Sequence, residues 1–320
     1  MTQEAPPALI LAGPTASGKS TLALALAERL GGVIINADAM QCYRDLRLLT
    51  ARPSPDDEAA QPHRLYGVRG AAETVNAAWW REAALAEMAA AHAAGRLPIL
   101  CGGSGLYLAV LCQGIVAIPQ IAPEVRAEAR ALLARLGAAG LHARLSAADP
   151  ATAARLRPSD AQRLTRAWEV WRATRRGLAQ WQEQPAQPAP WRFRALLIEP
   201  PREGLRAAIA ARFAAMLAAG AVEEVRALLG RGLDPALPLM RAHGVPELAA
   251  HLHGEITLAE AAARAIAAQS RYIKRQATWF RHHTLAAPEA THRIYARIAG
   301  PGQFSVVELE NLVRFVRAPG

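Results

Sequence analysis

The sequence predicts an α/β fold, in which a doubly wound parallel sheet of the P-loop type is interrupted by an all-helical insertion. Short apolar runs alternate with longer helical patterns over the first part of the chain, as parallel strands joined by helices do. A glycine-rich motif of the phosphate-binding kind, GPTASGKS at residues 13–20, joins the first apolar run to the first helical pattern. Beyond about residue 120 the apolar spacing is helical only, which indicates the insertion.

The amino-terminal elements follow a strand–helix–strand order. Residues 8–12 (ALILA) are typical of a buried strand, residues 21–30 of a helix that Gly31 and Gly32 end, and residues 33–38 (VIINAD) of a second buried strand. Ligands of such sheets bind at the carboxyl ends of the strands. The phosphate motif and the last residue of VIINAD are both expected there.

The third strand follows a loop and a helix. A Pro- and Asp-rich loop is predicted for residues 52–62, a helix for residues 76–94 and a strand for residues 97–100, which runs into the glycine turn CGGSG. This order extends the parallel sheet.

The insertion divides the core in two. We expect a core domain of residues 1–120 and 191–320 and a helical insertion of residues 121–190, which ends in the Pro/Gln-rich stretch QEQPAQPAP. The run FRALLIEP returns to the sheet, and helices continue to about residue 283. Residues from about 286 to 320 show only a weakly specified pattern and are expected to form a tail.

The composition is that of a protein of the cytoplasm. The 320 residues are 52% hydrophobic, and no uncharged apolar run has the 18 residues that would predict a membrane span. The start, MTQEAPP, lacks the basic and apolar regions of a signal peptide. Cys42, Cys101 and Cys112 have neither a metal-binding spacing nor that of a disulfide framework.

The charge points to a polyanionic partner. The net charge is +10, and basic residues are concentrated in two segments, residues 155–194 and residues 264–283. Within these, residues 159–177 and 271–283 alternate arginines with aromatic side chains. Cations neutralise phosphates and rings stack on unpaired bases, so this pattern suits RNA. The alternative is that the aromatic residues are core, and Trp168 and Trp279 are expected to be packed.

The phosphate motif is the strongest chemical signal. Its glycines allow backbone N–H groups to converge on phosphate oxygens, Lys19 supplies a compact charge, and the Ser20 hydroxyl can bind Mg²⁺. The chain has only two lysines, Lys19 and Lys274, against 35 arginines, so composition does not account for a lysine in the motif. The motif binds a diphosphate unit, which ATP and an allylic diphosphate both contain.

Two further residues are candidates at neighbouring strand ends. Asp38 follows a buried strand and could be a Mg²⁺ partner or a general base, or it could simply cap a turn. Ser104 lies in the glycine turn GGSGLY. No acidic residue ends the third strand, which disfavours a motor or switch NTPase.

Most of the chain resembles the tRNA dimethylallyltransferase (tRNA isopentenyltransferase, IPP transferase) family. The resemblance lies in an ordered series of motifs: GPTASGKS, INADAMQCYRDL, TARP, PHRL, GGSGLYL, DPATAARLRPSDAQRLTRAWEV, GAVEEVRALL and YIKRQATWFR. It implies transfer of a dimethylallyl group from dimethylallyl diphosphate to N6 of the adenosine 3′-adjacent to the anticodon in tRNAs, with Mg²⁺ and without ATP chemistry. The segment RAHGVPE departs from the family pattern at Val245 and Pro246.

The resemblance also implies roles for residues. Asp38 would accept a proton from the attacking amine, Ser104 would assist at the diphosphate, and Arg241 would stabilise the departing pyrophosphate. The diphosphate would be held by Gly13, Pro14, Thr15, Ala16, Ser17, Gly18, Lys19 and Ser20, with Ser20 also binding the metal. The anticodon stem-loop of tRNA would contact Asp38, Ala39, Met40, Gln41, Arg126, Gln162, Arg163, Leu164, Thr165, Arg166, Arg241, Lys274, Arg275, Gln276 and Arg281. We expect a monomer with no membrane partner.

Two other functions share some of these features. An ATP-dependent small-molecule or nucleotide kinase would use the same phosphate loop and sheet but has no need of the two basic segments. A nucleic-acid-binding module with a vestigial phosphate loop would bind tRNA and be indifferent to Lys19→Ala.

Overall fold

The computed structural model describes residues 4–300 and 303–318. The chain forms two compact units, one of residues 1–112 and 189–320 and one of residues 113–188. Residues 1–3, in the segment expected to lack a signal peptide, lie outside the described part, as do two short stretches of the expected tail.

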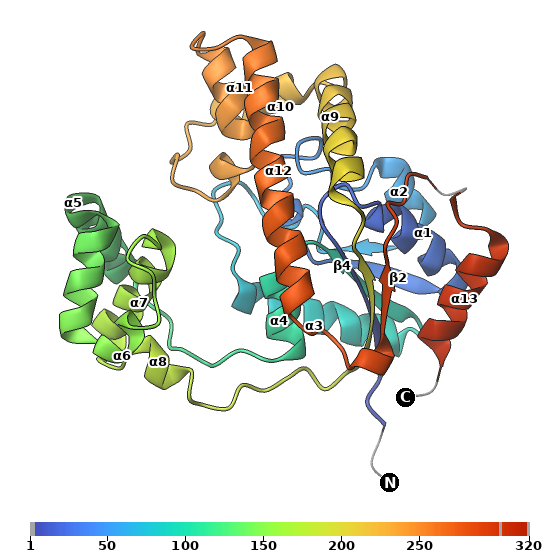
Figure 1. Ribbon diagram of the computed structural model, residues 1–320, viewed down its shortest axis with the longest axis horizontal. Coiled ribbons are helices and arrows are strands. Elements are labelled where there is room, and N and C mark those ends of the chain that lie inside the picture. The colour runs from blue at the N-terminus through green and yellow to red at the C-terminus, as the bar shows by residue number, and fades with distance from the viewer. Residues whose placement is uncertain (1–3, 301–302, 319–320) are drawn as a thin grey trace. The chain divides into compact units, whose positions relative to one another are not determined.

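The larger unit is built on a parallel sheet of six strands in the order β3-β2-β4-β1-β5-β6 (Figure 1). β1 lies between β4 and β5, with Leu11 opposite Cys101 on one side and Leu196 on the other. The strands are β1 (Pro7–Ala12), β2 (Gly32–Asn36), β3 (His63–Arg64), β4 (Leu97–Gly102), β5 (Arg192–Ile198) and β6 (Thr291–Ile294). The α/β parallel-sheet prediction is confirmed.

Helices cover both faces of the sheet because its strands alternate apolar side chains between them. On one face Leu9 and Leu11 pack with α1 and α13, and on the other Ile10 and Ala12 pack with α3 and α4. These helices are α1 (Lys19–Leu30), α13 (Val306–Arg317), α3 (Ala77–Ala93) and α4 (Gly105–Cys112). The alternation fixes the register of β1 and therefore the position of the phosphate loop that follows it.

A second cluster of helices lies at the carboxyl end of the strands. Phe213 and Leu248 from these helices pack with Tyr43 and Leu46 from the chain after β2. The helices are α9 (Arg202–Ala218), α10 (Ala221–Leu229), α11 (Val245–Leu252) and α12 (Leu258–His282), with short turns η1 (Met40–Cys42), η2 (Leu239–Arg241) and η3 (Pro288–Ala290).

The smaller unit is helical and has its own core. Leu132, Leu141, Leu164 and Trp168 are buried together, so Trp168 is packed as predicted. Its helices are α5 (Pro123–Ala148), α6 (Pro150–Ala153), α7 (Ala161–Thr174) and α8 (Leu178–Trp181). Gly137 interrupts α5 with a φ of 68°, a conformation that favours glycine.

Two local predictions were wrong. The expected loop at 52–62 contains the helix α2 (Pro55–Ala60), because Ser54 and Asp57 form a capping box and proline is compatible with the first turn of a helix. The expected tail contains β6, which extends the sheet beside β5, and α13, which packs on α1. β6 is only four residues long and three of them are polar, which gives little signal in sequence.

Among the described residues, no single helix is long and apolar enough to cross a membrane. The pair α9 and α10 meets the test of length and hydropathy only when taken together, and it is bent by 67°.

We predict that Leu312→Ala will lower the free energy of unfolding by about 2–4 kcal/mol, because Leu312 is buried between α13 and the sheet face that α1 covers. Urea denaturation measures the change. Val307→Ala is the control on the same helix, since Val307 is 66% exposed, and should change stability by no more than about 0.5 kcal/mol. Equal stability of Leu312→Ala and wild type would show that α13 is not part of the core.

Candidate active site

The phosphate loop lies between β1 and α1, at the positive end of α1. Gly18 is the N-cap of α1 with a φ of 89°, and Ala16 has a φ of 64°, so the loop contains two residues in the left-handed region. The Lys19 ammonium donates to the carbonyl of Pro14 at 3.3 Å, across the loop. Ser20 is exposed in the first turn of the helix. This conformation provides the N–H groups and helix end that phosphates bind.

Lys19 lies in an enclosed environment. Burial lowers the pKa of its ammonium below the ordinary value of 10.5, an effect that Cys101 and Asp38 oppose and that the neighbouring cation Arg212 adds to. Burial likewise lowers the pKa of Arg212, which Asp38 opposes. Two cations and one carboxylate therefore share one site.

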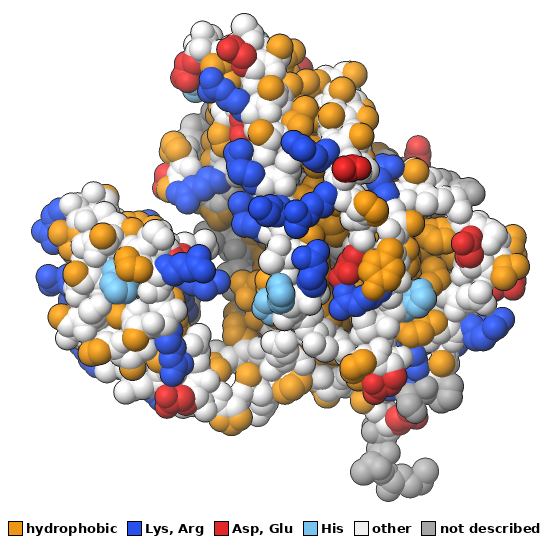
Figure 2. All heavy atoms as spheres, viewed as in Figure 1, with side chains coloured by type: hydrophobic (Ala, Val, Ile, Leu, Met, Phe, Trp, Pro, Cys, Tyr) orange, Lys and Arg blue, Asp and Glu red, His pale blue; other side chains and the backbone are white. Residues whose placement is uncertain are grey.

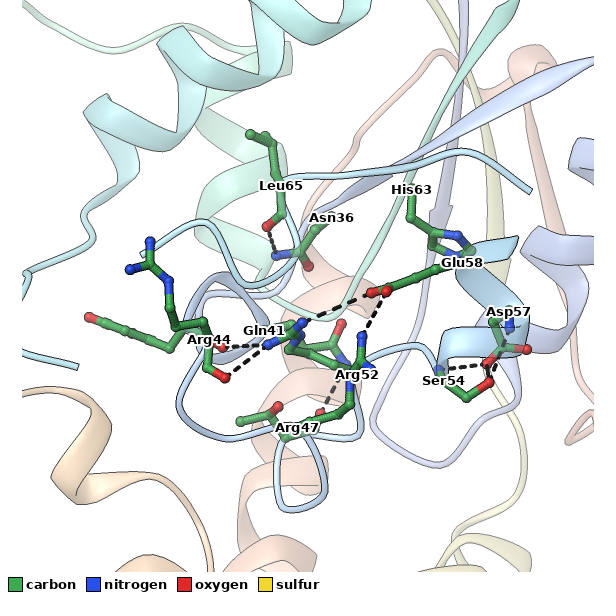
Figure 3. Close-up of polar contacts among 12 residues, drawn as sticks. Asn36, Gln41, Arg44, Arg47, Arg52, Ser54, Asp57, Glu58, His63 and Leu65 are labelled. Carbon is green, nitrogen blue, oxygen red and sulfur yellow. Dashed lines mark hydrogen bonds and ion pairs between the residues drawn. The ribbon is translucent and has the colours of Figure 1, made fainter. Parts of the chain in front are cut away.

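Asp38 is positioned by a buried asparagine at the end of β2. The Asn36 amide donates to the carbonyl of Leu65 at 3.0 Å (Figure 3) and to that of Asp38 at 2.9 Å, and its oxygen accepts from the Asp38 N–H at 2.8 Å. The Asp38 carboxylate accepts from the Met40 N–H at 3.0 Å. The backbone on both sides of Asp38 is thereby fixed, and one carboxylate oxygen is held by the turn that follows.

The glycine turn after β4 approaches the Asp38 segment closely. The Ser104 hydroxyl accepts from the Ala39 N–H at 3.0 Å, and the Ser104 N–H donates to the carbonyl of Ala37 at 3.1 Å. A Cβ at Gly102 would lie 2.1 Å from the Ala37 carbonyl, so glycine is required there. The segments of Asp38 and Ser104 are thus brought together, and no acceptor for the Ser104 hydroxyl proton is found among the residues that the structure describes.

The loop beyond Asp38 is held by an arginine network. Arg52 donates to the carbonyls of Tyr43 and Arg44 at 3.3 and 3.2 Å and pairs with Glu58 at 3.9 Å (Figure 3). Gln41, an expected tRNA contact, donates its amide to the carbonyls of Thr50 and Ala51 at 2.9 and 2.8 Å. Its donor group is therefore used inside this loop.

Gln276, expected to contact tRNA, has a different place. It is 5% exposed; its amide donates to the Gly103 carbonyl at 2.9 Å, and its oxygen accepts from the Thr15 N–H at 3.0 Å. The side chain joins the phosphate loop to the glycine turn, so burial and these two bonds leave it unable to reach an RNA partner from this position.

The other expected contacts on α12 are at the surface. Lys274, Arg275 and Arg281 are exposed, together with Arg264 and Arg271. Figure 2 shows Lys and Arg side chains gathered over α12. Trp279 packs instead against the glycine turn, where a Cβ at Gly105 would lie 2.3 Å from its ring.

The smaller unit carries the remaining expected contacts. Gln162, Arg163 and Arg166 are exposed on α7, but Leu164 is fully buried in the core of this unit, so its side chain is not available to RNA. The Thr165 hydroxyl donates to the Ala161 carbonyl at 2.7 Å. Arg126 is half-buried on α5, and its Nε has no hydrogen-bond partner among the described residues.

The arginine that lies near Lys19 is Arg212 and not Arg241. Arg241 is exposed at the end of η2, and no contact with the phosphate loop is found for it in the described part of the chain. Arg212, which sequence reasoning missed, has an enclosed Nε without a hydrogen-bond partner in the same part. The signal was present: Arg212 lies seven residues after Leu205 and three after Ile209, in the buried stripe of α9 that packs on Ala16.

A group-transfer enzyme of the P-loop class requires cations that can bind a diphosphate and a proton acceptor beside them. Similarity to known proteins identifies the family. A model of the family described as IPP transferase matches residues 41–283. Proteins named tRNA dimethylallyltransferase are 61% identical in Acidiphilium cryptum, over 98% of this chain and 96% of that one, and 57% in Granulibacter bethesdensis, over 97% and 98%. The chain belongs to the IPP transferase family.

Solved structures agree with this assignment. The full-length tRNA isopentenylpyrophosphate transferase from Bacillus halodurans superposes with a TM-score of 0.68 at 28% identity, over 98% of this chain and 96% of that one. A eukaryotic dimethylallyltransferase, described as acting on tRNA, shares the fold with a TM-score of 0.72 at 23% identity, over 86% and 70%.

We predict that the affinity for inorganic pyrophosphate, taken relative to that of Lys19→Met at the same pH, will fall as pH rises towards 10.5. The ammonium form of Lys19 attracts the anion; it persists below its pKa and is lost as pH rises through that pKa, which burial places below 10.5. Calorimetric titration at each pH measures the fall. Lys19→Met should bind more weakly and lack this step, whereas a wild-type affinity that holds constant relative to that of Lys19→Met up to pH 10.5 would contradict the assignment.

Proposed function

We propose that this protein transfers a dimethylallyl group from dimethylallyl diphosphate to N6 of the adenosine 3′-adjacent to the anticodon of tRNA. The observation that carries the proposal is the site itself, in which Lys19 and Arg212 supply positive charge beside the carboxylate of Asp38. Dissociation of an allylic diphosphate needs cations where charge develops and a base where a proton is released. The family's names agree with this chemistry.

The donor would be held by residues 13–20. As the bond from the allylic carbon to oxygen breaks, its electron pair leaves with the pyrophosphate. Lys19 and Arg212 would stabilise that charge, and their incomplete solvation makes the attraction stronger than it would be in water. The Ser104 hydroxyl, which accepts from the Ala39 N–H, can donate its own proton to a diphosphate oxygen. Arg241 is assigned a supporting role at the departing pyrophosphate.

The acceptor would be oriented by Asp38. Its carboxylate would accept a hydrogen bond from the exocyclic amine and then the proton released as the nitrogen–carbon bond forms. Asn36 holds the Asp38 backbone from both sides, which limits the movement of this base. The adenine must leave its stack to reach the base, and unstacking a loop nucleotide requires less energy than flipping a paired one.

The oxygen of Ser20 and those of a bound diphosphate suit a Mg²⁺ ion. The described residues include no group of three or more His, Cys, Asp or Glu side chains that could hold a metal. Mg²⁺ is commonly bound by few protein oxygens together with substrate phosphates and water. Ser20 is exposed beside the loop and offers one hard oxygen, so it would hold an ion that arrives with the diphosphate and supplies further charge neutralisation.

The tRNA would bind to exposed cations. Lys274, Arg275 and Arg281 on α12, and Arg163 and Arg166 on α7, have their charges in solvent, where phosphates can reach them. We assign the protein to the cytoplasm as a monomer; Cys42, Cys101 and Cys112 are unpaired, as a reducing compartment allows.

We predict that label from dimethylallyl diphosphate will appear in bulk tRNA in the presence of Mg²⁺ and without ATP, and that Asp38→Asn will lose this transfer at least about a hundredfold because the amide cannot accept the proton. The substitution keeps an oxygen that can accept from the Met40 N–H, so tRNA affinity should change less than threefold. Asp56→Asn, at an exposed position on α2, is the control. Transfer of a γ-phosphoryl group instead of label would establish the kinase alternative, and a fully active Asp38→Asn would refute the base.

Salt dependence tests the RNA surface. We predict that Lys274→Ala and Arg163→Ala will each weaken tRNA binding and flatten the slope of log affinity against log salt by about one unit, because each releases one counterion fewer. Filter binding over a range of salt concentrations measures the slope. Arg314→Ala removes an equal charge from an exposed position on α13 and should leave the slope unchanged; equal slopes for all four proteins would show that the tRNA lies elsewhere.

A further inference from the structure

The chain between β6 and α13 makes direct contact with the back of the phosphate loop. The Ile298 N–H donates to the Ser17 carbonyl at 2.9 Å, and the Arg297 Nε donates to the Ala16 carbonyl at 3.1 Å. Ile298 is 2% exposed and packs in the same apolar cluster as α1. Two successive peptide groups of the loop are therefore bonded to a segment almost three hundred residues away in sequence.

These bonds fix two peptide groups of the loop: the Ser17 N–H donates to the Pro14 carbonyl at 3.2 Å, and the Gly18 N–H is the one that a phosphate would use. A peptide group is planar and trans, so its carbonyl and its N–H point in opposite directions. The carbonyls of Ala16 and Ser17 belong to the same peptide groups as the N–H of Ser17 and of Gly18. Holding both carbonyls toward Arg297 and Ile298 directs the Gly18 N–H to the opposite side of the loop.

The loop has reason to need such support. Ala16 has a φ of 64°, a left-handed conformation that a residue with a Cβ adopts only when its surroundings favour it. Gly18 is required for a second reason besides its φ of 89°, because a Cβ there would lie 2.0 Å from the Ile298 carbonyl. The close approach of the two backbones is thus built into the sequence on the loop side.

The segment is itself anchored in the fold. The Gln303 amide donates to the Arg297 carbonyl at 2.7 Å, and its oxygen accepts from the Ala299 N–H. β6 precedes the segment and pairs with β5, with Ala195 opposite Thr291. Support for the loop therefore comes from the core sheet and α13 through Arg297 and Ile298, not from the loop alone.

We propose that Arg297 and Ile298 are positioning residues of the diphosphate site, which hold the phosphate loop in its anion-binding conformation from behind. The proposal rests on the proposed function, since it takes the loop as the site of the diphosphate. Neither residue is assigned any contact with the donor or with tRNA.

The test is Arg297→Ala, which removes the bond to Ala16 and leaves Ile298 in its apolar cluster. We expect the KM for dimethylallyl diphosphate and the Kd for inorganic pyrophosphate to rise about five- to tenfold, as loss of one hydrogen bond that orders a site predicts. The KM for tRNA and the thermal midpoint should stay near those of wild type. Arg297→Lys keeps a donor and should recover the affinity to within about threefold of wild type.

Arg314→Ala is the matched control, because Arg314 is an exposed arginine of the same carboxyl-terminal segment, on α13. Pyrophosphate titration of the wild type without tRNA separates the two proposals. A wild type that fails to bind pyrophosphate overturns the proposed function. A wild type that binds it, with an Arg297→Ala that binds equally well, overturns the positioning role alone. An Arg297→Ala that loses tRNA affinity and thermal stability as much as pyrophosphate affinity also overturns it, since that is the result of general unfolding.

Discussion

The site depends on a phosphate loop whose backbone is held by residues from distant parts of the chain. Gln276 accepts from the Thr15 N–H, Arg297 donates to the Ala16 carbonyl, and Ile298 donates to the Ser17 carbonyl. A short loop that contains residues with left-handed backbone would not keep one conformation in isolation, because conformational entropy and backbone strain both oppose it. The sequence of the loop makes the conformation accessible, and contacts from α12 and from the chain after β6 select it.

Burying the charges of Lys19 and Arg212 costs free energy in the free protein. Lys19 and Arg212 are both partly removed from water, and the lowered pKa of each shows that burial disfavours its charge. Asp38 offsets only part of this for two cations. An incoming diphosphate would complete the charge balance, so the arrangement favours a bound anion over an empty site. Binding of the donor would thus offset the cost of burying these two cations in the free protein.

Sequence reasoning succeeded where the signal is local. The phosphate motif, the Asp38 strand end and the return strand before α9 are each specified within about a dozen residues of sequence, and the structure places all of them at one sheet. It failed where the signal is long-range. β6 is a strand because it pairs with β5, which its own four residues do not reveal. Gln276 lies in a basic run and was expected at the surface, but α12 directs its side chain toward Gly103. Arg212 could have been found, because an arginine in an apolar stripe has to be explained.

The packing of α12 shows why a local reading of basic segments misleads. Lys274 and Arg275 are exposed on this helix, while the next residue, Gln276, is buried against the phosphate loop. A helix turns by about 100° per residue, so adjacent residues in a basic run lie on different faces and make different contacts. Phe280, four residues on from Gln276, is buried on the same side, against the core that carries the glycine turn. The exposed cations and the buried amide therefore belong to one helix, and the helix that would present charge to RNA also contacts the phosphate loop through Gln276.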